Sequence, residues 1–309
     1  MVLILGDIES MESSLNLPNH ADAFTESVKT NSKKLIELGL WDMKLTRLEG
    51  WLNQFIGGEE QFFAACILSR VIFRNRQQFE SGLRSLFRSN LNGVFCSHQP
   101  DHHLLERLLT QPDPKIRLVP VICEDDPPTK SGPLVMRRLQ RILKIEPSYM
   151  CWPWQIKEDP SIEQVIFVDD FLGSGTQFKL FFEKWGFDSL PQCKKYFYAP
   201  VVAHVKGLNY LEHELPVVEV VSAEILNESH NFFSDKVWNQ LSKNQISAAD
   251  AENWYKTFFY TRINTSSEDM AHLGFSNMGL TFGFSHSTPD NSLPIIWANS
   301  SSWQPLLER

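Results

Sequence analysis

The chain has 309 residues, of which 42% are hydrophobic and 12% aromatic, so it can bury one large or two modest cores and is not globally disordered. The formal net charge of −8 and the isoelectric point near 5.6 argue against a broad nucleic-acid or anionic-membrane surface. The five cysteines are widely spaced without a Cys-x-x-Cys pair, and no apolar run approaches membrane-spanning length, so we predict a reduced, cytoplasmic protein that is neither exported nor anchored.

The first third of the chain has the apolar spacing of helices. Residues 1 to about 22 are polar and interrupted by Asn and Pro, which predicts a loosely held arm. From there to about residue 110, apolar side chains recur at three- and four-residue spacing. We therefore expect residues 1–110 to form a helical N-terminal domain that docks a partner or caps a site. The predicted helices are 32–40, 45–56, 59–75, 77–89 and 101–109.

Five arginines follow one another at roughly helical spacing in this region. Such a stripe suits phosphate groups or an acidic partner, and it equally suits a solvated helix face, so both interpretations stay open. The stripe consists of Arg70, Arg74, Arg76, Arg84 and Arg88.

The pattern changes after residue 111. The pattern predicts a strand over residues 116–123 and a helix over 134–145, with an acidic, turn-rich segment between them. Just before the helix, Lys130, Ser131 and Gly132 make a loop that suits an anion, although an ordinary turn with a solvated lysine has the same composition. This strand, loop and helix are a candidate anion site.

The most informative stretch is 164–177. Four apolar residues, 165–168, predict a strand buried on both faces, and Asp169 and Asp170 follow at once. Small residues come next and let backbone N–H groups approach an anion, before a helix over 178–185 that ends at a glycine. The pattern predicts a phosphate-binding turn with an adjoining acid pair. The turn consists of Gly173, Ser174, Gly175, Thr176 and Gln177.

Further strands and helices alternate up to residue 221. Strands are predicted over 195–204 and 217–221, with a short helix over 207–214 between them. This alternation from 116 onward calls for a parallel α/β sheet, whose ligands bind at the carboxyl ends of the strands. Both candidate anion loops fall on that edge.

The C-terminal part returns to helical spacing over 230–262 and then forms a strand over 280–284. A polar loop follows, in which His286, Thr288 and Asn291 are clustered beside two prolines that limit its freedom. Such a loop suits recognition of a base or another substrate, and a merely structural loop is the alternative.

The stretch 164–177 resembles the ribose-5-phosphate-binding signature of type I phosphoribosyltransferases. The resemblance implies that Asp169 and Asp170 contact the ribose hydroxyls of phosphoribosyl pyrophosphate (PRPP) and that the loop after them holds its 5′-phosphate. It also implies that Lys130, Ser131 and Gly132 form the pyrophosphate loop. Mg²⁺ would be carried by PRPP, with Asp169 or Asp170 as candidate ligands. One position departs from the family pattern, because its last Ser/Thr is Gln177 here.

The C-terminal sequence narrows the resemblance to one group of phosphoribosyltransferase-like proteins. The pattern His-x-Thr-Pro-x-Asn-x-Leu-Pro and the tryptophans after it resemble phosphoribosyltransferase-like proteins of bacterial conflict and antiphage gene clusters, some beside retron reverse transcriptases. The implied fold is an α/β domain over 111–309 with a parallel sheet behind the helical domain. The implied function is phosphoribosyl transfer with release of pyrophosphate, as a defence effector.

Other functions remain open in the sequence. The alternative is a non-catalytic sensor of PRPP or a nucleotide, or an effector scaffold, regulated by a protein partner. A partner or a second copy would dock through the N-terminal helices. Direct binding to nucleic acid or membrane is not expected, while indirect association with nucleic acid through a defence complex stays open.

Overall fold

The structure, a computed structural model of the chain, describes residues 14–98, 104–110, 113–190, 194–263 and 271–309. These residues form two compact units. The helical unit contains the described residues up to Ile72 together with Ser229–Phe282 and Ser292–Glu308, and the sheet unit contains Phe73–Glu228 and Gly283–Asn291. Residues 1–110, for which we predict one helical domain, therefore contribute to both units. No helix in the described part of the chain is both long and apolar enough to cross a membrane.

The helical unit is built around aromatic side chains. The Phe63 ring is fully buried and lies 4.8 Å from Trp254 and 5.5 Å from Tyr255. Its helices are α1 (Ala21–Glu37), α2 (Leu45–Leu52), α3 (Gly57–Arg70), α11 (Asp235–Ser242), α12 (Ala248–Phe258) and α13 (Pro294–Trp297), with a π-helical turn Phe259–Ile263 and a 3-10 turn Phe275–Asn277.

Several predicted helix bounds in this region are wrong, among them the end of the second helix, which is Leu52 rather than residue 56. The first helix begins at Ala21 rather than residue 32, because polar residues of an amphipathic helix fill the stretch between the predicted arm and residue 32. The predicted helix over 59–75 ends at Arg70, where Val71 turns extended, and Ile72–Arg74 form strand β1. The β-branched pair at 71 and 72 favours this change. The arginine stripe therefore does not lie on one helix.

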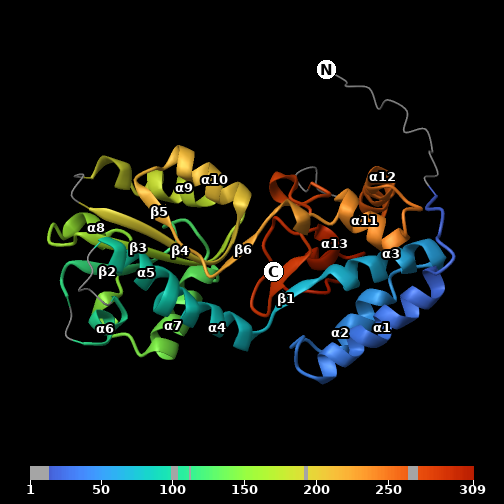
Figure 1. Cartoon of the computed structure of the whole chain (residues 1–309), viewed down its shortest axis with the longest axis horizontal. Coiled ribbons are helices and arrows are strands. Elements are labelled where there is room, and N and C mark those ends of the chain that lie inside the picture. Colours follow the sequence, from blue (N-terminus) through green and yellow to red (C-terminus); the bar gives the residue numbers. More distant parts are fainter. Residues whose placement is uncertain (1–13, 99–103, 111–112, 191–193, 264–270) are drawn as a thin grey trace, which may run out of the picture. The chain divides into compact units, whose positions relative to one another are not determined.

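The sheet unit contains a parallel five-stranded sheet. Its strands run in the order β2, β3, β4, β5, and β6 also pairs with β4 (Figure 1). This confirms the predicted α/β class with a parallel sheet and N-terminal helices, the arrangement expected of a type I phosphoribosyltransferase. The strands are β2 (Ile116–Pro120), β3 (Gln164–Leu172), β4 (Lys195–His204), β5 (Val218–Val220) and β6 (Glu224–Leu226).

Pro200 lies inside the long strand β4 without breaking it. Strand β5 pairs with residues 196–198 of β4, whereas β6 pairs with residues 202–204. Pro200 thus falls where the neighbouring strand changes, so its missing N–H removes no ladder bond on that side. We did not predict β6 because three residues are too few for a period-2 pattern.

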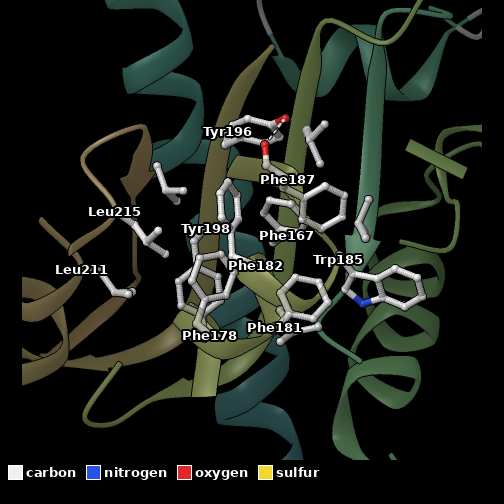
Figure 2. Close-up of a cluster of buried hydrophobic side chains, with 14 of the residues drawn as sticks. Phe167, Phe178, Phe181, Phe182, Trp185, Phe187, Tyr196, Tyr198, Leu211 and Leu215 are labelled. Carbon is white, nitrogen blue, oxygen red and sulfur yellow. Dashed lines mark hydrogen bonds between the residues drawn. The ribbon is translucent and has the colours of Figure 1, made fainter. Parts of the chain in front are cut away.

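Helices cover both faces of this sheet. Helices α9 and α10 lie on one face, and α4 and α7 lie on the other (Figure 1). The α9 face holds an aromatic cluster, in which the rings of Phe178 and Tyr198 are stacked 3.7 Å apart (Figure 2). The helices of the unit are α4 (Arg76–Ser85), α5 (Leu91–His98), α6 (Leu104–Leu109), α7 (Ser131–Leu143), α8 (Gln155–Glu158), α9 (Thr176–Lys184) and α10 (Val205–Glu214), with a π-helical turn Leu86–Asn90 and 3-10 turns Pro147–Tyr149 and Phe187–Ser189.

Strand β1 pairs with β7 (Phe282–Phe284) in a separate two-stranded sheet. The Ser285 N–H donates to the Arg74 carbonyl oxygen at 3.0 Å, so the polar loop starts directly from this pairing. The Arg74 guanidinium in turn donates from Nε to Glu224 Oε2 at 2.9 Å. The segment that follows β7 is thereby anchored within the sheet unit.

Candidate active site

The acid pair lies in the carboxyl half of β3, and its two carboxyl groups lie close enough to interact with each other. Successive side chains alternate along a strand, so Asp169 shares a face with Phe167. On the α9 face, the Tyr198 hydroxyl donates to Asp169 Oδ2 at 3.0 Å, and Asp169 Oδ1 accepts the Asp170 N–H at 2.9 Å. Asp169 is only 4% exposed.

Asp170 is bound by the C-terminal loop. Its Oδ2 lies 3.1 Å from His286 Nε2 and accepts a hydrogen bond from Ser287 Oγ at 3.2 Å. The His286 ring packs against Phe79 of α4, 4.7 Å away, and is nearly parallel to Phe284 at 5.0 Å. Asp170 is 7% exposed. The fold thus brings together an acid and a histidine that are 116 residues apart.

The two acids have opposite pKa shifts. Burial raises the pKa of Asp169 well above the ordinary value, and the neighbouring charge of Asp170 adds to this increase. Burial acts in the same direction on Asp170, but the His286 and Ser287 contacts and the pairing with Asp169 together hold its pKa below the ordinary value. Burial also raises the pKa of the Tyr198 hydroxyl, as does the Asp169 charge beside it. Burial and their mutual repulsion therefore disfavour a negative charge on both carboxyl groups at once.

The raised pKa of Asp169 predicts how stability depends on pH. A carboxyl group whose pKa is higher in the folded state loses its proton first in the unfolded chain, so it lowers the free energy of unfolding as the pH rises from about 4. We expect Asp169→Asn to remove this fall and to stabilise the protein at neutral pH. Urea unfolding of the wild type and of Asp169→Asn at a series of pH values measures the free energy of unfolding of each. If both free energies change with pH in the same way, the pKa of Asp169 is not raised in the folded protein.

The predicted phosphate loop connects β3 to α9. Gly175 has φ +88°, a conformation that favours glycine, and Thr176 begins the helix. The Ser174 hydroxyl accepts the Thr176 N–H at 3.4 Å and donates to Thr176 Oγ1 at 3.2 Å. The first amides of α9 adjoin this loop, which is the usual place for an anion. Gln177 lies exposed in the first turn.

Two neighbouring segments press closely on this loop. A Cβ atom on Gly173 would lie 1.9 Å from Asn291 Oδ1, so the Asn291 carboxamide rests on the Gly173 backbone. A Cβ atom on Gly207, in the first turn of α10, would lie 2.3 Å from the Gly173 carbonyl oxygen. The polar loop on one side and α10 on the other therefore fix Gly173.

The second predicted anion loop leads into α7. Lys130 is the residue before the helix, Ser131 is its first residue, and a Cβ atom on the buried Gly132 would lie 2.9 Å from the Val121 carbonyl oxygen. The Lys130 ammonium pairs with Asp126 Oδ2 at 2.8 Å and not with an acid of β3. Because β2 and β3 are parallel neighbours, both loops nevertheless follow the same edge of the sheet.

The predicted substrate loop meets the acid pair and the phosphate loop. His286 reaches Asp170, Asn291 reaches Gly173, and Thr288 is buried in the segment between them. Sequence reasoning missed Ser287 and Tyr198. The alternation along β3 and β4 was a signal that Tyr198 shares the Asp169 face, whereas nothing distinguished Ser287 from other loop serines.

The donor set limits how a metal ion could bind. Over the described ranges, no group of three or more His, Cys, Asp and Glu side chains is placed to hold a metal ion. Each of the two carboxyl groups already accepts hydrogen bonds from the protein. Mg²⁺ prefers a carboxylate or two together with phosphate and water oxygens. The site therefore fits Mg²⁺ only if a ligand supplies most of the oxygens.

Two cavities of the sheet unit are compared with the position of the acid pair. A groove of about 960 Å³ is lined by residues such as Lys195 and Val218, at the amino ends of β4 and β5, where parallel sheets do not bind ligands. A cavity of about 240 Å³ is lined in part by Phe79, Phe284 and Val202, on the face of His286. Of these two, the smaller cavity adjoins residues that contact His286.

Comparison with known proteins agrees with this geometry. No curated protein matches the chain significantly. The sequence profile of the PRTase-CE family matches residues 48–309, which include the whole parallel sheet, the acid pair and the polar loop. The chain therefore belongs to the PRTase-CE family, the phosphoribosyltransferase-like proteins of conflict and effector systems.

Proposed function

We propose that the protein binds PRPP at the carboxyl edge of its sheet and transfers the phosphoribosyl group with release of pyrophosphate, as a cytoplasmic effector of bacterial antiphage defence. The observation that carries this proposal is the acid pair of β3 followed directly by the glycine-rich turn into α9, in a chain of the PRTase-CE family. A retron-associated defence complex is the proposed setting.

Each part of the site has a role in this reaction. The first amides of α9 and the loop from Gly173 to Thr176 would bind the 5′-phosphate. Asp169 and Asp170 would orient the ribose hydroxyls, and the negative charge of the pair would stabilise positive charge that develops at the ribosyl carbon. Lys130 would exchange Asp126 for the departing pyrophosphate. Mg²⁺, when bound with PRPP, supplies further neutralisation of the pyrophosphate charge.

A second candidate function is a non-catalytic sensor of PRPP or a nucleotide, or an effector scaffold. The observation that favours it is the burial of both acids, whose oxygens accept hydrogen bonds from the protein itself. In this case ligand binding would change the protein's partner contacts without bond cleavage.

The reaction is tested by incubating the pure protein with Mg²⁺ and PRPP, with and without a metabolite extract. Pyrophosphate release and new ribosylated masses are measured together. We expect both, with the extract supplying the acceptor. PRPP binding without either product would favour the sensor, and absence of binding would contradict both functions.

We propose that a protein partner or a second copy docks on the N-terminal helices. Apolar side chains are exposed there, and Leu38, at the end of α1, and Leu40 are 67% and 45% exposed. We expect Leu38→Ser with Leu40→Ser to lower the mass of the native complex measured by light scattering.

Leu180→Ser is the matched control, since Leu180 is 59% exposed on α9, outside these helices. An unchanged mass of the Leu38 and Leu40 variant would refute docking at this surface.

A further inference from the structure

The segment from Ser285 to Asn291 contacts both Asp170 and the phosphate loop. At one end, His286 and Ser287 both bind Asp170 Oδ2. At the other end, the Asn291 carboxamide lies against Gly173. Asp170 is left 7% exposed, so its carboxyl group offers little surface to a ligand in solution.

The segment contacts the same groups, Asp170 and the Gly173 backbone, that a bound ribose phosphate would contact. A ribose hydroxyl that donates to Asp170 Oδ2 would have to replace His286 or Ser287, which use both lone pairs of that oxygen. A phosphate would approach the Gly173 backbone, yet Asn291 Oδ1, itself an acceptor, is placed there and would repel it. The segment and the ligand therefore compete for one site.

The docked position of His286 has an unfavourable feature. With Nε2 directed at Asp170, its Nδ1 is buried and has no hydrogen-bond partner. A buried polar atom without a partner is costly, and Nδ1 would regain water if the segment moved away. This cost reduces the stability of the covered state relative to an open one.

We infer that the segment from Ser285 to Asn291 is an intrasteric inhibitor, which occupies the ribose-phosphate site and must leave before PRPP binds. This inference rests on the proposed function for the identity of the ligand. Whether the segment shields Asp170 from reagents does not depend on the identity of the ligand, so this part can be tested without PRPP.

The test compares the wild type with the double variant His286→Ala, Ser287→Ala, which loses both donors to Asp170. His286→Gln is the matched control, because its amide nitrogen retains a donor near the position of Nε2. Circular dichroism verifies that each variant is folded. The first readout is labelling of Asp170 by a water-soluble carbodiimide with an amine, followed by mass spectrometry. The second is the calorimetric affinity for PRPP with Mg²⁺.

We expect the double variant to label faster at Asp170 and to bind PRPP about tenfold more tightly, since losing a hydrogen bond to a charged group raises the open fraction by about that factor. The glutamine variant should behave like the wild type. Equal labelling of wild type and double variant, or weaker PRPP binding by the double variant, would overturn the inference. Faster labelling without PRPP binding by any form would support the covering and reject the proposed function instead.

Discussion

Replacing both acids of β3 by asparagine is expected to lower pyrophosphate release from PRPP by at least about a hundredfold. Asparagine keeps the shape and the acceptor oxygen, so His286 and Ser287 still find a partner at position 170 and Tyr198 finds one at position 169. The variant therefore removes the charge and leaves the packing. Pyrophosphate release is measured together with thermal unfolding, which should show a folded protein.

Asp188→Asn is the control for this experiment, because Asp188 is an exposed acid of the same unit in the 3-10 turn after α9. Its activity should equal that of the wild type. If the variant of Asp169 and Asp170 retains full pyrophosphate release and full defence activity, the acid pair has no catalytic role and the enzyme is not the one proposed.

The second large effect is expected at Gly207. An alanine Cβ there would lie 2.3 Å from the Gly173 carbonyl oxygen and 2.9 Å from the Leu172 side chain. A backbone oxygen cannot rotate away, so α10 or the phosphate loop must shift, and we expect Gly207→Ala to lower the free energy of unfolding by about 1 to 3 kcal/mol. PRPP affinity should fall as well, because the displaced loop is the proposed phosphate site. Urea unfolding and calorimetry measure the two effects.

Gly93→Ala provides a matched helical control. Gly93 lies in α5, and a Cβ atom there has no neighbour within 4 Å. Alanine should stabilise this helix by about 0.5 to 1 kcal/mol through its better helix propensity. A Gly207→Ala protein as stable as Gly93→Ala would show that the contact between α10 and the Gly173 loop is not tight.

Local patterns predicted the part of the fold that holds the site. The strand over 195–204 is β4, with the same bounds, and the buried run at 165–168 is the centre of β3. These patterns succeed because a strand buried on both faces must be apolar almost throughout, and because glycine is needed where φ is positive, as at Gly175. The parallel order then places both anion loops on one edge.

Local sequence patterns could not predict contacts between residues that are far apart in the chain. Nothing near Asp170 indicates that its hydrogen bonds come from residues 116 and 117 positions later. The lowered pKa of Asp170 depends on those partners, so it was equally hidden. Strand β1 was missed for a related reason, because its pairing partner β7 lies some 200 residues away and the helix spacing of α3 continues into it.

We propose the turn between β3 and α9 as the ribose-phosphate site. Amide hydrogen exchange with and without PRPP and Mg²⁺ tests it most directly, with ribose and Mg²⁺ alone as the reference. We expect slower exchange over residues 170–178, where the loop and the first turn of α9 would hold the phosphate, and faster exchange over 285–291, as the covering segment leaves. Unchanged exchange over both segments at saturating PRPP would contradict the claim.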